Sequence, residues 1–129
     1  MSGYEGPADV GQLAVPVGEL ERSVAFYRDV LGLRFLFRAP PGLAFLQCGS
    51  VRLMLSQRPP GAPAAAMGVV YYRVPDLDLA YRTLRARGAT FVDQPHRIAR
   101  LEEHELWMVF LRDPDDHLLA LMAERPLTG

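Results

Sequence analysis

The chain contains an internal repeat, and this repeat restricts its possible folds more than any other feature. Residues 12–35 match residues 69–91 at an offset of about 57 residues. The four residues that begin at Val17 (VGEL) correspond to the four that begin at Val74 (VPDL). A repeat of this length is one supersecondary unit built twice. The sequence therefore predicts two similar modules within one fold.

Hydrophobic periodicity divides the first repeat into one strand, one helix and three further strands. Gln12–Val17 alternates as a strand, and Glu19–Leu31 carries a helical apolar stripe that stops at Gly32. Turn residues separate the three strands that follow, which are Arg34–Arg38, Leu43–Cys48 and Val51–Ser56. The first unit is therefore predicted to be βαβββ.

The second repeat predicts the same order of elements. Val69–Val74 is a strand, and a helix starts at Asp76, a good N-cap, and stops before Gly88. The later strands are expected at Thr90–Asp93, His104–Arg112 and His117–Met122. The segment Gln94–Glu103 has no counterpart in the first unit, and we expect it to be a long loop.

Length and composition predict a single domain over residues 1–129. We expect a first module at residues 11–57, a linker rich in proline and alanine at residues 58–67, and a second module at residues 68–124. The formal net charge is −1, with acidic and basic residues interleaved, so nucleic acid is not expected as a partner. No apolar run is long enough to span a bilayer, so a membrane is not expected either.

Residue usage favours a cytoplasmic bacterial protein. The single Cys48 excludes an intrachain disulfide, and the N-terminus lacks the charged and apolar regions of a signal peptide. All 14 cations are arginine, and lysine and asparagine are absent. Lysine and asparagine use AT-rich codons, so their absence indicates a bacterial genome of high GC content.

Two motifs carry a resemblance to a known family. One is ELERSVAFY at Glu19–Tyr27, and the other is FLRDPD at Phe110–Asp115, just before the last strand. With the repeat, they resemble the glyoxalase / bleomycin-resistance / extradiol dioxygenase superfamily, also called the vicinal oxygen chelate (VOC) superfamily. The likeness extends over residues 11–124. Asp116 stands where the family's D-P-D-G turn has glycine, and we expect it to tolerate the positive φ of that position.

The resemblance implies an α+β fold of two tandem βαβββ modules whose curled mixed sheets form a cup-shaped ligand cavity. Ligand would lie on the concave face, and helices would cover the convex face. The resemblance also implies a homodimer, with binding sites at or near the subunit interface.

In metal-dependent members of the family, the first and last strands of each module supply the metal ligands. Strand parity together with the resemblance places Gln12, Met54, Val69 and Ala120 at these positions. Only Gln12 has a ligand atom, whereas a catalytic zinc needs about three protein ligands. We therefore expect no metal, no other cofactor and no catalytic residue of the usual kind. The family's lactoylglutathione lyase, epimerase and dioxygenase activities all use that metal, so the missing ligands argue against all three.

The cup is expected to be apolar and aromatic, with a few polar groups to orient a ligand. In the strand over residues 104–112, we expect Trp107 and Val109 to face the cup, with Met108 and Phe110 facing the helix. The expected ligand-binding residues are Gln12, Arg52, Met54, Tyr71, His96, His104, Trp107, Val109 and Ala120.

Three functions are compatible with such a cup. The favoured hypothesis is a metal-free dimeric protein that sequesters a small hydrophobic or aromatic molecule, such as an antibiotic. The second is an enzyme of the same fold, with a displaced metal site at His96 and His104 plus Glu103 or Glu105, or with acid–base work by the histidines or Tyr71. The third is a non-catalytic scaffold whose cup is filled by side chains.

Overall fold

The computed structural model describes residues 3–64 and 66–127, which form two β-sheets in sequence order. The first sheet has the order β1-β4-β3-β2, with β1 parallel to β4 and the other neighbours antiparallel. The strands are β1 (Gln12–Val17), β2 (Arg34–Ala39), β3 (Leu43–Cys48) and β4 (Val51–Gln57). Between β1 and β2 lies α1 (Leu20–Ala25), which continues as the π-helical segment η1 (Phe26–Val30).

The second sheet repeats this arrangement with the order β5-β9-β8-β6, and β7 also pairs with β8. Its elements are β5 (Val70–Arg73), α2 (Leu77–Ala86), β6 (Thr90–Phe91), β7 (His96–Arg100), β8 (His104–Arg112) and β9 (Leu118–Pro126). The predicted α+β fold of two βαβββ units is thus confirmed. The prediction of a long loop at Gln94–Glu103 is wrong for its middle part, because β7 adds to the edge of the sheet along β8.

Local chemistry explains where the helices and turns lie. The Asp76 carboxylate accepts a hydrogen bond of 3.1 Å from the Leu79 amide and so caps the start of α2. Gly32 and Gly88 have φ of 94° and 93° where the two helical segments end. Asp116 has φ of 66°, as expected from its place in the D-P-D turn.

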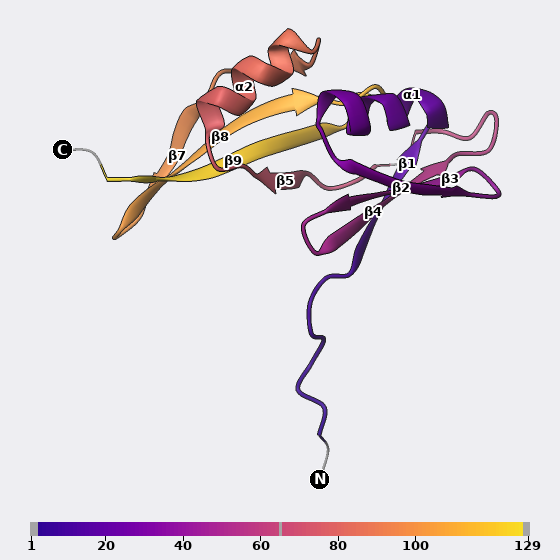
Figure 1. Cartoon of the computed structure of the whole chain (residues 1–129), viewed down its shortest axis with the longest axis horizontal. Helices are drawn as coiled ribbons and strands as arrows, with labels where there is room; N and C mark the ends of the chain where they lie inside the picture. Colours follow the sequence, from indigo (N-terminus) through magenta and orange to yellow (C-terminus); the bar gives the residue numbers. More distant parts are fainter. Residues whose placement is uncertain (1–2, 65, 128–129) are drawn as a thin grey trace.

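Both helices lie on the same side of the two sheets (Figure 1). The core fills the space between helices and sheets, with Val24 of α1 and Leu77 of α2 packed in one cluster with strand residues such as Leu55 and Leu121. All four side chains are buried, and each contributes about 1.5–3 kcal/mol through loss of contact with water. The opposite side of each sheet carries no helix, and we call these surfaces the helix-free faces.

The N-terminal segment before β1 extends away from the sheets (Figure 1), and its described residues are exposed. Among the described elements, no helix has both the length and the apolar character required to cross a bilayer.

Candidate functional site

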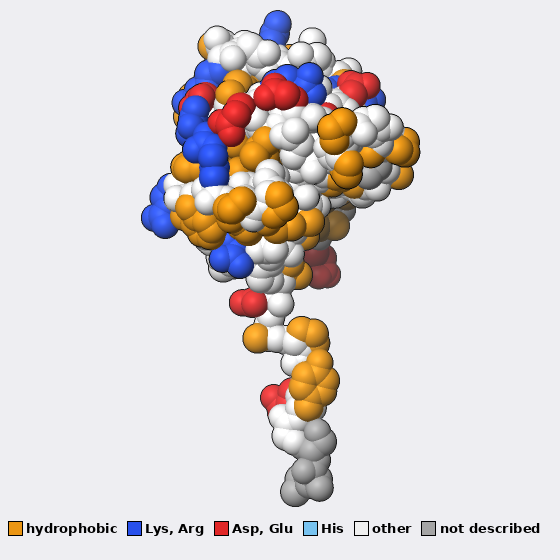
Figure 2. Space-filling model, turned by 90° about the vertical axis from the view of Figure 1, so that its right-hand side faces the viewer, with side chains coloured by type: hydrophobic (Ala, Val, Ile, Leu, Met, Phe, Trp, Pro, Cys, Tyr) orange, Lys and Arg blue, Asp and Glu red, His pale blue; other side chains and the backbone are white. Residues whose placement is uncertain are grey.

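Strand register defines which side chains share the helix-free face of the first sheet, because residues directly opposite each other point to the same side. Phe37 lies opposite Phe45, Phe45 opposite Met54, and Met54 opposite Ala14. The Phe37 and Phe45 rings stack with centroids 4.6 Å apart. These four residues form what we call the apolar row. Figure 2 shows hydrophobic side chains gathered in the lower part of this end of the molecule, below a band of charged ones.

The row next to the apolar row on the same face is polar. It consists of Arg34, Gln47, Arg52 and Gln12, which lie opposite one another across the four strands. Arg52 Nε donates a hydrogen bond of 2.7 Å to Gln12 Oε1, and its guanidinium lies 5.2 Å from the centre of the Phe45 ring. Gln12 Nε2 contacts Met54 Sδ at 3.7 Å. Gln12, Arg52 and Met54 therefore meet on the face where the sequence placed them.

The second sheet repeats the apolar row with different side chains. Tyr71 lies opposite Ala120, and Ala120 lies opposite Phe110. The Tyr71 and Phe110 rings meet edge to face at 6.2 Å, and the His96 ring stacks at 6.4 Å from Phe110. Ala120 is on this face as expected but is fully buried. A ligand would therefore touch the rings of Tyr71 and Phe110 before it reached the alanine.

The expected orientation of β8 is wrong. Val109 lies opposite Leu121, and both are fully buried in the core that contacts α2, so Val109 faces away from the helix-free side. Trp107 has the same parity, packs against this core, and donates a hydrogen bond of 3.0 Å from Nε1 to Glu105 Oε1. The pairing of β8 with β9 shows that Ala120 and Val109 point to opposite sides of one sheet, so the two residues cannot both face the cup.

Three aromatic residues of the helix-free faces were missed in the sequence, namely Phe37, Phe45 and Phe110. A signal for Phe45 was present, because Gly49-Ser50 is a two-residue turn that pairs Cys48 with Val51. Counting back from that turn places Phe45 opposite Met54. The same counting fails across the β8–β9 turn, because the expected strands leave four residues in that turn, whereas the structure has five, and this one residue changes the partner of Phe110 from Leu119 to Ala120.

His96 and His104, the two histidines among the expected ligand-binding residues, do not converge on a common site. His96 lies opposite Met108, whereas His104 lies four positions away on β8, roughly 13 Å along the strand. His96 Nδ1 is 2.8 Å from the Gln94 carbonyl oxygen, and His104 Nε2 is 3.6 Å from Glu124 Oε2. The Glu105 side chain is buried and accepts the Trp107 hydrogen bond. A displaced metal site formed by both histidines and Glu105 is thus incompatible with this geometry.

The family's usual chelating positions also lack the donors for a metal. Met54 offers one thioether, Val69 and Ala120 offer no ligand atom, and the amide oxygen of Gln12 already accepts from Arg52. A divalent cation here would lose hydration without replacement. The residues present therefore do not fit the metal.

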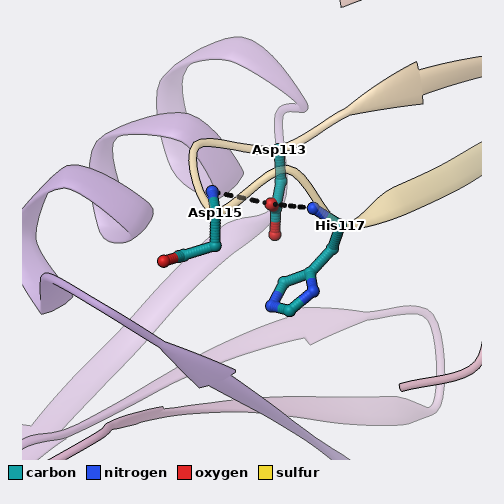
Figure 3. Close-up of side chains that lie close together, drawn as sticks. All are labelled: Asp113, Asp115 and His117. Carbon is teal, nitrogen blue, oxygen red and sulfur yellow. Dashed lines mark hydrogen bonds between the residues drawn. The ribbon is translucent and has the colours of Figure 1, made fainter. Parts of the chain in front are cut away.

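One other group of described side chains has the composition of a metal site. The ligand atoms of Asp113, Asp115 and His117 all lie within 4.8 Å of one another, and we call these residues the acid cluster (Figure 3). Asp113 Oδ1 accepts hydrogen bonds of 2.9 Å from the amides of Asp115 and His117. His117 Nε2 lies 3.0 Å from the Pro16 carbonyl oxygen. These contacts shape the turn between β8 and β9.

The acid cluster binds the first half of the chain. Asp115 Oδ1 accepts from the Gly18 amide at 2.8 Å and from Arg22 and Arg58 at 3.2 Å each. Asp115 Oδ2 accepts from the Ser23 hydroxyl at 3.3 Å. Two arginines already balance this buried carboxylate. We therefore assign the acid cluster to structure, as the contact that joins the two modules.

A groove of about 390 Å³ lies where the edge of the first sheet approaches β5. Leu13 and Cys48 line one side, and Val70, Tyr71 and Arg73 line the other. Burial raises the pKa of the Cys48 thiol above its usual range, which disfavours the nucleophilic thiolate. The groove thus offers apolar volume beside Tyr71 but no activated nucleophile.

Comparison with known proteins gives one family and several similar structures. The family model described as "Glyoxalase/Bleomycin resistance protein/Dioxygenase superfamily" matches residues 9–121. No curated protein sequence matches the chain significantly.

Three solved bacterial proteins illustrate the structural similarity. Lactoylglutathione lyase from Agrobacterium tumefaciens has a TM-score of 0.71 at 24% identity, with 92% of this chain and 95% of that chain covered. TnmS3, an antibiotic binding protein from Streptomyces sp. CB03234, has a TM-score of 0.75 at 21% identity, covering 94% and 99%. TioX from Micromonospora sp. ML1 has a TM-score of 0.73 at 23% identity, covering 93% and 100%. Identities at this level establish a shared fold.

Proposed function

We propose, from the fact that this chain belongs to the Glyoxalase/Bleomycin resistance protein/Dioxygenase superfamily, that it binds a small hydrophobic or aromatic molecule without using a metal. The ligand would lie against the helix-free faces, on the apolar row of the first sheet and the Tyr71–Phe110 pair of the second. The proposed role is sequestration, and it includes no catalytic residue.

The observation that carries this proposal is the exposure of aromatic rings on both helix-free faces. Phe37 and Tyr71 are each 47% exposed, although each contacts a second ring on its own sheet. Exposed apolar side chains that touch one another often mark a binding site. Aromatic walls with a few polar groups such as Gln12 are also the usual composition of a small-molecule site.

Two of the similar structures support different functions. TnmS3 is described as an antibiotic binding protein, which supports an antibiotic as the ligand here. The Agrobacterium protein is described as a lyase, which keeps an enzyme as the alternative. Against that alternative, His96 of β7 pairs with Met108, four residues away from His104 on β8, and the family's chelating positions lack donors.

We also propose a homodimer. In one chain, both helices lie on the same side of the sheets, so the helix-free faces lie open (Figure 1). A second copy would supply an opposing wall and would cover rings such as Phe37 and Tyr71. The proposed ligand would then be enclosed between two subunits, as the family resemblance implies.

Native mass spectrometry of protein purified without chelators, followed by elemental analysis, tests both proposals. We expect the mass of a dimer, no stoichiometric metal, and uptake of a flat hydrophobic antibiotic from a panel. About one equivalent of metal per chain would contradict metal-free binding. Tryptophan fluorescence is a poor substitute here, because Trp107 packs on the core side of β8.

A matched pair of variants tests where the ligand lies. Phe37→Ala removes an exposed ring from the apolar row and should weaken uptake about tenfold, because a stacking face is lost. Leu79→Ala removes a side chain that is 52% exposed on α2 and should leave uptake unchanged. Equal effects of the two substitutions would place the ligand elsewhere.

A further inference from the structure

Resting on the proposed function, we infer that the ligand is a flat aromatic anion. Its acidic group, a carboxylate, sulfonate or phenolate, binds Arg52, and its rings lie on the apolar row. The inference depends on how Arg52 is held, on the absence of a protein carboxylate near it, and on the neighbouring aromatic surface.

Arg52 is held in place on the helix-free face. Its Nε donates to Gln12 Oε1 at 2.7 Å, and the guanidinium lies against the Phe45 ring at 5.2 Å from the ring centre. The two contacts restrict a side chain that otherwise loses much rotamer freedom on binding. They involve Nε and one surface of the guanidinium plane, so the terminal nitrogens remain to donate in parallel to a bidentate anion.

Arg52 has no acidic partner in the part of the chain that the structure describes. Within residues 3–64 and 66–127, no aspartate or glutamate lies within ion-pair distance of it. Another arginine of the same sheet shows the contrast, because Arg38 on β2 makes two hydrogen bonds, of 2.9 and 2.6 Å, to the Glu21 carboxylate. The polar row contains two arginines and two glutamines and no acid. This row is thus rich in donors and suited to an anion.

Arg52 also stands next to an aromatic floor. The Phe37 and Phe45 rings are stacked with an interplanar angle of 28°, and Phe45 is the ring that Arg52 contacts. A planar ligand on Phe37 would therefore extend toward the guanidinium, and Met54 would lie beneath its edge. An arginine beside stacked rings can bind a conjugated acid through its charge and its flat surface together.

Two dyes test the inference because they differ by one group. Anilinonaphthalene sulfonate is an anion, and N-phenylnaphthylamine is the same ring system without the sulfonate. Both fluoresce when they enter an apolar site, so both dissociation constants can be measured with the full-length protein. The wild-type chain should bind the sulfonate at least about tenfold more tightly, with a preference that falls as salt is added.

Arg52→Gln should remove this preference while it leaves the affinity for the neutral dye within about twofold. Arg82→Gln, which removes an exposed cation from α2, should change neither constant. The inference is overturned if Arg52→Gln weakens the binding of both dyes equally, or if it weakens the binding of neither. It is also overturned if Arg82→Gln has the same effect as Arg52→Gln. Circular dichroism in the near ultraviolet confirms that each variant is folded.

The same titrations separate this inference from the proposed function. If Phe37→Ala leaves the affinity for both dyes unchanged, the ligand does not lie on the apolar row, and the proposed function fails. If Phe37→Ala weakens both dyes but Arg52→Gln is not selective, the proposed function stands and the anionic ligand is excluded.

Discussion

Tyr27 places a polar group in the buried core. Its side chain is 2% exposed, and its hydroxyl donates a hydrogen bond of 2.7 Å to Asp113 Oδ2. Burial, and next the negative charge of Asp113, raise the pKa of Tyr27 far above its usual range. This hydroxyl thus links the first module to the acid cluster in the second.

Tyr27→Phe should lower the free energy of unfolding by about 1–3 kcal/mol at neutral pH, because a buried acceptor of Asp113 loses its donor. Urea unfolding measures the change. Tyr81→Phe is the matched control, because its hydroxyl takes part only in an exposed contact of 3.4 Å with Arg85. We expect less than about 0.5 kcal/mol for the control, and equal losses would contradict the assigned role of Tyr27.

The raised pKa also predicts a pH dependence. Above about pH 10, tyrosine loses its proton in the unfolded chain, while Tyr27 in the folded chain keeps it. The unfolded state then binds fewer protons, so the free energy of unfolding falls as pH rises. Unfolding curves between about pH 9 and 11 should show a steeper fall for the wild type than for Tyr27→Phe. Parallel curves would mean that Tyr27 ionises normally.

At the scale of elements, the sequence predicted where the strands and helices lie better than it predicted which way their side chains face. Most strands begin and end within a residue or two of the expected positions, because turns and glycines mark their ends. In β8, however, the run Trp107–Leu111 is apolar at every position, so alternation does not distinguish its two faces. Pairing with β9 makes that choice, and pairing also creates β7 from a polar segment. Long-range register is the information that local pattern lacks.

The candidate site shows the same division. Gln12, Arg52 and Met54 lie on the expected faces because β1 and β4 alternate. Tyr71 lies on its expected face through its pairing with β9, whereas the expected orientation of Trp107 and Val109 was wrong. Counting outward from the β8–β9 turn corrects β8 only once the turn is known to hold five residues, because a shift of one residue moves every side chain to the other face.

The cap of α2 gives a prediction at this scale. Asp76→Ala should lower the free energy of unfolding by about 1 kcal/mol, because the Leu79 amide loses its acceptor. Glu19 holds the corresponding position before α1 but makes no side-chain cap bond. Glu19→Ala should therefore cost less than about 0.5 kcal/mol in the same denaturant titration. A larger loss for Glu19 than for Asp76 would contradict this account of the helix starts.

At the scale of the whole molecule, the two modules are joined through Asp115. Its side chain is 4% exposed and accepts hydrogen bonds from Gly18, Arg22, Ser23 and Arg58. A Cβ atom on Gly18 would lie 2.8 Å from Asp115 Oδ1, so this approach needs a glycine. The modules therefore meet through a charged, closely fitted contact as well as through the shared core.

Asp115→Ala should lower the free energy of unfolding by about 3 kcal/mol, because two arginines and an amide lose one buried acceptor. Asp29→Ala removes an exposed carboxylate paired with its neighbour Arg28 and should leave the free energy of unfolding almost unchanged, because water screens the pair. Calorimetry of both variants checks this. A small loss for Asp115 would mean that the core alone holds the modules together.

The acid cluster has a consequence for how this molecule can change over generations. The second repeat carries the buried Asp115 carboxylate, and the groups that donate to it come from the first repeat and from Arg58 in the connector. If the two halves were separated by a cut in the connector, the Asp115 carboxylate would lose the groups that donate to it. A substitution at Asp115, or at one of its partners in the other repeat, should therefore be tolerated only together with a compensating change.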